Sequence, residues 1–219
     1  MHCINQASFF CSWSGGKDAC LAFYHAVQAG GKPRCLFTML SEDGERSRAH
    51  ALPLRILESQ ASSLGIPLVV GSASWGGYEQ VFVDQMRKFK EEGIEFGVFG
   101  DIDLEGHREW QEKVCSMARM KAYLPLWGRS RREIVTELVE LGFQALIVAV
   151  NEEKMDRQYL GRVMDRPLMD ELESKGIDVA GENGEYHTVI TGGPLFQNPI
   201  TMEVKGLKSY EKHCFLHID

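Results

Sequence analysis

The chain of 219 residues is organised around the stretch Ser12-Trp13-Ser14-Gly15-Gly16-Lys17-Asp18. This stretch follows a short apolar run, residues 7–11, and opens another, residues 19–24, which continues at helical spacing. A strand, a glycine turn and a helix start are therefore expected here. Adjacent glycines let backbone N–H groups approach a ligand, and a helix N-terminus attracts negative charge. The stretch thus predicts an anion site, most naturally for phosphate.

Two charged residues end this stretch. Lys17 supplies a mobile cation, whereas Asp18 would repel a phosphate and so indicates a role toward a metal or a substrate. The competing interpretation is a strand–turn–helix connection that binds no ligand, because glycine turns are common.

Strands and helices alternate along the chain as far as residue 150. Further strands are expected at residues 34–40, 67–71, 94–100, 122–127 and 143–150, with helices at 52–64, 77–92, 106–120 and from about Ser130. This alternation predicts an α/β fold, a Rossmann-like parallel sheet with helices on both faces. Ligands of such sheets bind beyond the carboxyl ends of the strands, so the glycine stretch and Asp101 are expected at one edge.

The pattern changes after Asn151. A short helix is expected at residues 167–175, and strands are expected at 189–190 and 201–204. The chain is therefore expected to divide into a nucleotide-binding domain, residues 1–150, and a smaller C-terminal α+β lobe, residues 151–219.

Composition excludes several classes of protein. The net charge is −7, which argues against an extensive nucleic-acid-binding face. No apolar run approaches the roughly 20 residues that span a bilayer, and the first residues lack a signal-peptide pattern. The six cysteines form no CxxC pair, so a zinc site is not expected. We expect a cytoplasmic protein with reduced thiols and no membrane association.

The stretch matches neither of two common phosphate-binding motifs. A Walker A loop would need glycine at Cys11 and a hydroxyl group at Asp18. The dinucleotide fingerprint fails because Gly15 and Gly16 are adjacent and Ala19 stands where a third glycine belongs. What remains, Ser-Gly-Gly-Lys-Asp after a first strand, resembles the pyrophosphate loop of the N-type ATP pyrophosphatases, the PP-loop superfamily.

Further motifs narrow this resemblance. They are Ser47-Arg48-Ala49-His50-Ala51, residues 60–67, Gly100-Asp101-Ile102, His107-Arg108-Glu109-Trp110, Pro125-Leu126-Trp127 and Gly181-Glu182-Asn183-Gly184-Glu185-Tyr186-His187-Thr188. Together they resemble the diphthine–ammonia ligase family over about residues 8–204. Two positions depart from the family pattern: Ala19 replaces a serine of the loop, and Asn183 replaces a glycine of the last motif.

The resemblance implies an adenine nucleotide alpha hydrolase-like fold and an ATP-dependent, AMP-forming amide ligase. A carboxylate would be adenylated by ATP, with Mg²⁺ as cofactor, and ammonia would then displace AMP. The acceptor in this family is diphthine, a modified histidine on elongation factor 2. Ammonium would be free, since no glutaminase module is visible, and a homodimer is one option for the assembly.

The resemblance also implies site residues. Residues expected to bind ATP are Ser12, Ser14, Gly15, Gly16, Lys17, Asp18, His50, Gly100 and Asp101. Residues expected to act in catalysis are Lys17, Asp18, Glu182, Glu185 and His187, with Asp18 also as the metal ligand. Bland interpretations compete: a solvated polar turn for the two glutamates, a structural role for the histidines and a helix N-cap for Asp101.

Other functions stay open at this point. The chain could be a bacterial-type paralogue that amidates another acid, such as a corrinoid or a small metabolite, or an ATP-binding module without turnover. A tRNA thiolation or lysidine-type enzyme is less consistent, because it predicts paired cysteines or a large basic surface. Nucleotide contacts by Arg108 or Arg129 are also left open.

Overall fold

The computed structural model describes residues 3–47 and 50–218. A five-stranded, fully parallel sheet forms its first half, in the order β3-β2-β1-β4-β5. The strands are β1 (Ser8–Ser12), β2 (Lys32–Leu40), β3 (Leu68–Ser72), β4 (Phe96–Val98) and β5 (Lys121–Tyr123). The second half of β2 is buried without interruption, as expected of a strand that is covered on both faces.

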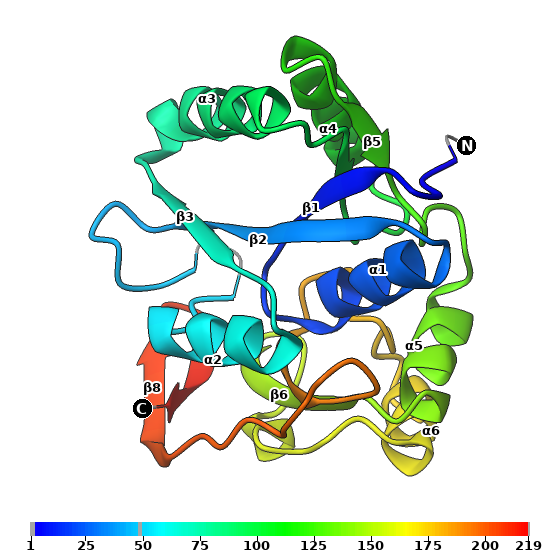
Figure 1. Cartoon of the computed structure of the whole chain (residues 1–219). Helices are drawn as coiled ribbons and strands as arrows, with labels where there is room; N and C mark the ends of the chain where they lie inside the picture. Colours follow the sequence, from blue (N-terminus) through cyan, green and yellow to red (C-terminus); the bar gives the residue numbers. More distant parts are fainter. Residues whose placement is uncertain (1–2, 48–49, 219) are drawn as a thin grey trace.

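Helices cover both faces of this sheet, as Figure 1 shows. On one face lie α1 (Lys17–Gln28) and α2 (Leu54–Leu64), and on the other lie α3 (Tyr78–Glu91), which follows the 3₁₀ turn η1 (Trp75–Gly77), and α4 (Glu105–Met117). Each face has its own apolar core, and the larger core continues from α1 and α2 into the second half of the chain. The expected α/β class is confirmed.

The order of strands reverses beside β1. The chain runs outward from β1 through β2 to β3 and returns to β4 on the other side of β1. The carboxyl ends of β1 and β4 are therefore neighbours, and the loops that follow them separate toward opposite faces. This is where an open parallel sheet binds its ligand, so the topology places Ser12–Lys17 and Gly100-Asp101 at one site.

The second half of the chain forms a smaller antiparallel sheet, in the order β7-β6-β9-β8. Its strands are β6 (Gln144–Asn151), β7 (Tyr186–Gly192), β8 (Val204–Tyr210) and β9 (His213–Ile218), accompanied by α5 (Arg131–Glu140), the 3₁₀ turn η2 (Arg157–Tyr159) and α6 (Arg166–Ser174). Figure 1 shows β6 and its neighbours beyond the layer of α1 and α2, opposite α3 and α4. The expected smaller α+β lobe is confirmed.

One expectation about the sheets was wrong. Strand β6 does not extend the parallel sheet, because it pairs antiparallel with β7 and β9. Its apolar run is buried on both faces, and burial alone does not distinguish a parallel from an antiparallel partner. The strand expected at 201–204 begins only at Val204, and β9 was not anticipated. The division of the chain near residue 150 stays a prediction.

No helix among the described residues is both long and apolar enough to cross a bilayer.

Candidate functional site

The glycine loop lies between β1 and α1. Gly15 has φ +81°, and a Cβ there would come within 2.9 Å of Leu52 and Leu57. Gly16 is the extended N-cap of α1, where a Cβ would collide with the imidazole of His50 and lie 3.1 Å from the Thr188 carbonyl oxygen. Both glycines are required because other parts of the chain press against the loop.

Strand β7 of the second sheet holds this loop in place. Ile190 N donates to the Gly15 carbonyl oxygen at 3.0 Å, and Lys17 N donates to Thr188 Oγ1 at 3.1 Å. The glycine loop belongs to the first half of the chain, and the second half therefore holds its backbone through hydrogen bonds. The sequence motif included Thr188, but its spacing gave no indication of this contact.

Gln60 completes the support of the loop from α2. Its Nε2 donates to the carbonyl oxygens of Gly15 and Ile190, both at 2.8 Å, and its Oε1 accepts from Trp13 Nε1 at 2.8 Å. The side chain is fully buried, so each of these bonds satisfies a group that water does not reach. The sequence motif of residues 60–67 included Gln60 but gave it no role, although a glutamine on the apolar face of an expected helix was an available signal.

Lys17 and Asp18 form an ion pair at the start of α1. Lys17 Nζ lies 2.8 Å from Asp18 Oδ2, while Asp18 Oδ1 is buried and has no hydrogen-bond partner among residues 3–47 and 50–218. Burial raises the pKa of Asp18, the Lys17 charge opposes the rise, and the Asp101 charge adds to it. A buried carboxylate oxygen without a partner indicates a place for a cation or a donor from a ligand.

The loop after β4 packs directly on this pair. At Gly100, a Cβ would lie 2.6 Å from the backbone carbonyl carbon of Asp18. Asp101 is not an N-cap, because α4 begins at Glu105. Its carboxylate instead accepts from His107 Nδ1 at 2.7 Å and from Gln111 Nε2, and the bond to Asp101 raises the pKa of His107.

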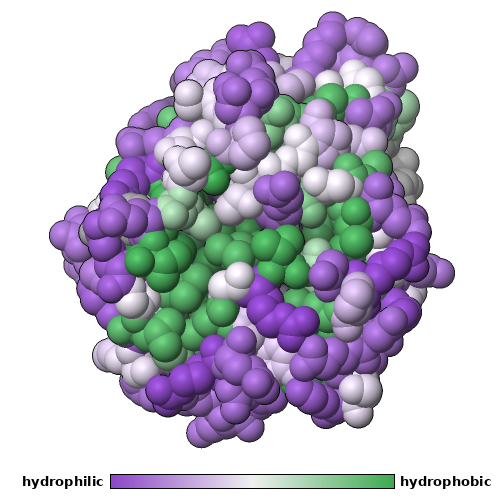
Figure 2. Space-filling view, turned by 90° about the horizontal axis from the view of Figure 1, so that it is seen from below, coloured by the Kyte–Doolittle hydropathy of each residue, from purple (hydrophilic) through white to green (hydrophobic). Residues whose placement is uncertain are grey.

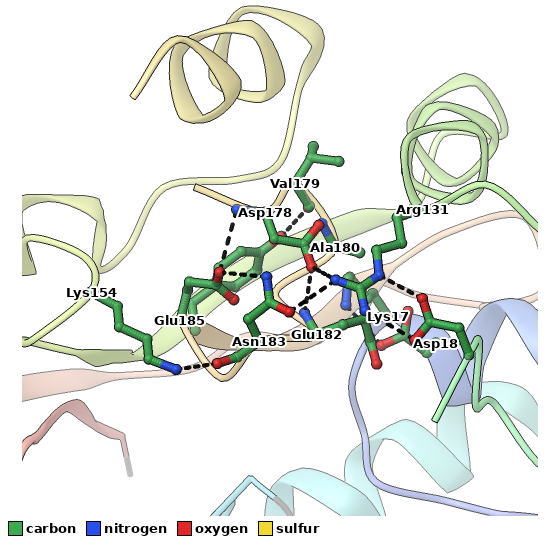
Figure 3. A network of polar contacts seen from close by, with 12 residues as sticks. Lys17, Asp18, Arg131, Lys154, Asp178, Val179, Ala180, Glu182, Asn183 and Glu185 are labelled. Atoms are coloured by element: carbon green, nitrogen blue, oxygen red, sulfur yellow. Dashed lines mark hydrogen bonds and ion pairs between the residues drawn. The ribbon is translucent and has the colours of Figure 1, made fainter. Parts of the chain in front are cut away.

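Glu182 completes an acidic group with Asp18 and Asp101. Burial, followed by the charge of Asp18, raises the pKa of Glu182 to about 7, although Lys17 opposes the rise. Glu182 comes from the loop before β7, so the two halves of the chain each contribute carboxylates to one site. Figure 3 shows Glu182 with Lys17 and Asp18.

Arg131, the first residue of α5, holds the loop that carries Glu182. Its guanidinium contacts Asp103 at 2.7 Å and Asp178 at 2.6 Å, and it donates to Asn183 Oδ1 at 3.1 Å. Asp178 Oδ2 in turn accepts from the backbone N of Glu182 at 3.0 Å. These bonds, drawn in Figure 3, connect the first half of the chain with the acidic loop. Asn183, the departure from the family pattern, takes part in this network.

Glu185 bonds within its own loop. Its Oε1 accepts from Asp178 N at 3.4 Å and from Asn183 Nδ2 at 3.2 Å. Its Oε2 is buried without a hydrogen-bond partner in the described part of the chain. Figure 3 shows it on the far side of Asn183 from Lys17. An action of Glu185 on the acceptor stays a prediction.

His50 and His187 stack on each other, with ring centroids 4.7 Å apart. His50 Nδ1 donates to the Thr188 carbonyl oxygen at 3.0 Å. Burial lowers the pKa of His187 to about 4 and that of His50 well below its usual value, and the Lys17 charge contributes to both shifts. Both imidazoles are therefore neutral near pH 7. Arg48 and Ala49, from the same motif as His50, lie outside the described residues.

The remaining expected residues lie around the loop or away from it. Ser12 ends β1, and Ser14 Oγ accepts from Gly16 N at 3.3 Å. Arg108 pairs with Glu112 at 2.9 Å, and Arg129 pairs with Glu137 at 2.7 Å. Both arginines thus have carboxylate partners on helices, and their contacts to a nucleotide stay an open prediction.

Comparisons with known proteins agree over most of the chain. The family model of the diphthamide synthase N-terminal domain matches residues 8–122, and the model of the diphthamide synthase C-terminal domain matches residues 130–219. The human diphthine–ammonia ligase is 26% identical over 216 residues, covering 87% of this chain and 80% of the relative. The bovine diphthine–ammonia ligase is 25% identical over 228 residues, covering 92% and 85%.

Among solved structures, a predicted subunit of tRNA methyltransferase from Methanocaldococcus jannaschii has a TM-score of 0.43 and 13% identity. It covers 86% of this chain and the whole of that one.

Proposed function

The chain belongs to the diphthamide synthase family, and from this premise we propose how its site works. It is a ligase that forms C–N bonds by ATP-dependent amidation. The proposal for the site is based on one observation, the arrangement of the side chains of Lys17, Asp18 and Glu182. Lys17 and Asp18 stand at the start of α1 on a glycine loop, and Glu182 from the other half of the chain lies beside them.

The first step uses the loop and Lys17. A carboxylate oxygen of the acceptor attacks the α-phosphorus of ATP, the bond between the α-phosphorus and the bridging oxygen breaks, and pyrophosphate leaves. Ser14, the backbone of Gly15 and Gly16, and the N-terminus of α1 bind the pyrophosphate. The Lys17 ammonium neutralises the charge that develops on the leaving group.

The second step uses the acidic group. Ammonia attacks the acyl carbon of the adenylate, and AMP leaves with the oxygen that had joined it to the acyl group. The nitrogen must lose a proton, and Glu182, whose pKa lies near 7, is suited to accept it. The neutral imidazoles of His50 and His187 beside Lys17 help to keep the adenylate from water.

A magnesium ion fits this site through Asp18. Asp18 Oδ1, which has no hydrogen-bond partner among the described residues, is a hard oxygen ligand. Burial and neighbouring carboxylates raise the pKa values of Asp18 and Glu182, and a bound cation would oppose this rise. Among the described residues no three His, Cys, Asp or Glu side chains form a ready metal site, so phosphate oxygens of ATP would supply further ligands. The ion would neutralise polyphosphate charge when bound.

The acceptor is the part of the proposal that relies on relatives alone. The similar proteins from human and cattle are named diphthine–ammonia ligases, which supports diphthine on elongation factor 2 as the acceptor, with ammonium as the nitrogen source. The cytoplasm is the corresponding location. Another acid stays the alternative acceptor, and an assay with candidate acceptors distinguishes the two.

The test is an assay of pyrophosphate and AMP release from ATP with ammonium and candidate acceptors. Mass spectrometry then follows the conversion of the acceptor carboxylate to an amide. Release of AMP and pyrophosphate that requires both ammonium and acceptor supports the proposal. Release of ADP and phosphate would overturn it, and ATP binding without release with any acid would favour the non-catalytic module.

Association with a second copy also stays a prediction. The space-filling view from below shows a broad apolar area framed by hydrophilic residues (Figure 2). Val163, Val204 and Leu207 are exposed apolar side chains of the second half of the chain. Light scattering after size-exclusion chromatography measures the oligomeric state directly.

A further inference from the structure

Tyr186 is a residue of the acidic motif to which the proposed steps give no role. It begins β7, is buried with 3% of its surface exposed, and its hydroxyl donates to the Val179 carbonyl oxygen. Burial, followed by the charge of Asp18, raises the pKa of this hydroxyl well above its usual value. The hydroxyl is therefore neutral near pH 7 and bonded to the backbone, which leaves the ring as the part that can act on a neighbouring charge.

The ring of Tyr186 lies against the Lys17 ammonium. Lys17 Nζ stands over this ring, 5.8 Å from its centroid, and the lysine is itself buried. Lys17 N donates to Thr188 Oγ1 at 3.1 Å, and side chains two residues apart on a strand point to the same face. One face of β7 therefore contacts Lys17 both at its backbone and at its charged end.

An aromatic ring holds a cation differently from a carboxylate. The negative face of the ring attracts the ammonium without neutralising it. Lys17 donates one hydrogen bond to Asp18 Oδ2 at 2.8 Å, and an ammonium group has three donors. The ring can thus fix the position of the ammonium while donors and charge remain for phosphate oxygens.

The same ring supports the loop that carries Glu182. At Gly181, which has φ +73°, a Cβ would come within 3.1 Å of Tyr186 Cε1. Gly181 therefore packs on the ring, and the hydroxyl bonds to Val179 two residues earlier. Glu182 follows Gly181 directly. One buried side chain thus contacts both Lys17 and the backbone before Glu182.

We propose that Tyr186 is a positioning residue, whose ring holds the Lys17 ammonium toward the glycine loop and at a fixed place relative to Glu182. This inference rests on the proposed function, because it gives Tyr186 a part in the binding of pyrophosphate by Lys17. The hydroxyl holds the acidic loop, whereas the ring holds the cation. Substitutions can separate these two parts.

The test measures the affinity of the full-length protein for pyrophosphate by isothermal titration calorimetry, at a fixed Mg²⁺ concentration and without ATP. Tyr186→Phe keeps the ring and loses the bond to Val179, so the affinity should stay within about twofold of the parent. Phenylalanines with increasing ring fluorination in place of Tyr186 keep the shape but weaken the negative face of the ring. The affinity should fall stepwise along this series, by about 2- to 30-fold in total. Equal affinity along the series would overturn the inference.

Removal of the ring has a matched control in the same core. Tyr186→Leu should weaken pyrophosphate binding at least as much as the most fluorinated ring does. Tyr159→Leu is the control, because Tyr159 is also a buried tyrosine with a bonded hydroxyl, and its ring lies near Arg162 and Lys175. The control should lose thermal stability yet bind pyrophosphate within about twofold of the parent. An equal loss of affinity in both variants would show general damage to the fold and would overturn the inference.

A measurement without any ligand separates this inference from the proposed function. Protons at the end of the Lys17 side chain should be shifted upfield by the ring current in NMR spectra of the parent and of Tyr186→Phe, and Tyr186→Leu should lose this shift. Absence of the shift in the parent would overturn the inference. A parent that shows the shift but binds no pyrophosphate would contradict the proposed function of the glycine loop and leave the contact between Lys17 and Tyr186 standing.

Discussion

The Glu182 carboxyl group takes up a proton on folding when the pH lies between its unfolded-state and folded-state pKa values. Its pKa is raised to about 7 because burial and the Asp18 charge disfavour the ionised form. In the unfolded chain an ordinary glutamate titrates near 4.3. The folded state therefore binds more protons than the unfolded state between these values, and the stability that Glu182 contributes at low pH is lost as the pH rises through 7.

Glu182→Gln tests this balance, because glutamine imitates the protonated form. At pH 4 the variant and the parent should unfold at similar denaturant concentrations. At pH 8 the variant should be more stable by about 1–3 kcal/mol, since the parent then carries the buried charge. Urea titrations at several pH values, without ATP or metal, measure the difference. Parallel pH profiles of the two proteins would contradict it.

Lys17 is the residue whose removal should affect chemistry most. Lys17→Met keeps the length of the side chain and removes the charge, so the leaving pyrophosphate loses its neutralising partner and Asp18 loses its ion pair. We expect kcat/KM for ATP to fall by about 10²–10³-fold in the pyrophosphate assay. Lys32→Met is the control, because Lys32 is exposed at the start of β2 and should leave kcat/KM within twofold. Near-normal activity of Lys17→Met would exclude it from the site.

At the scale of elements, the contact between the end of β4 and the start of α1 shapes the glycine loop. Gly100→Ala should destabilise the protein by about 1–3 kcal/mol, because the new Cβ would lie 2.6 Å from the Asp18 backbone. Affinity for ATP should fall as well, since Asp18 must shift. Thermal unfolding and nucleotide titration measure the two effects.

Gly106→Ala is the matched control for this substitution. Gly106 lies inside α4, and a Cβ there would meet nothing within 4 Å. The same change should therefore stabilise the protein by up to about 1 kcal/mol through helix propensity. If both variants change the stability by the same amount, the close approach at Gly100 does not affect the free energy of unfolding.

The sequence predicted elements well where a local pattern determines them. Apolar runs bounded by glycine identified β1 to β4, and the glycine loop followed from Gly15 and Gly16 alone. The pairing of β6 and the existence of β9 were not predictable, because pairing depends on which distant strand arrives. Strand β8 is exposed along its whole length and so shows no alternation of burial. Gln60 and Thr188 support the loop through contacts between distant residues, which spacing along the chain does not reveal.

At the scale of the whole molecule, Arg131 joins the two halves of the site. It contacts Asp103 near the parallel sheet and Asp178 and Asn183 beside the acidic loop. The planar guanidinium reaches all three at once, whereas an ammonium group would not. The position of Glu182 relative to Lys17 therefore depends on a residue that touches neither.

Arg131→Lys should consequently act on the second step of the reaction. We expect the KM for ammonium to rise by about tenfold, because the loop that carries Glu182 loses its fixed position, while ATP binding stays within about twofold. Initial rates of AMP formation at varied ammonium, together with ATP titration, measure this difference. Arg132→Lys is the control, because Arg132 pairs only with Asp170 and Glu173 of α6 among the described residues. If Arg131→Lys raised the KM for ammonium and the dissociation constant for ATP equally, a positioning role for Arg131 would be contradicted.

The hydrogen bonds from β7 to the glycine loop also bear on how the protein is made. The ribosome synthesises Lys17 171 residues before Thr188, and Thr188 and Ile190 hold Lys17 and Gly15. A nascent chain that has completed only the parallel sheet lacks these bonds, and its loop is not yet fixed. We therefore expect a fixed nucleotide loop only after the ribosome has synthesised β7.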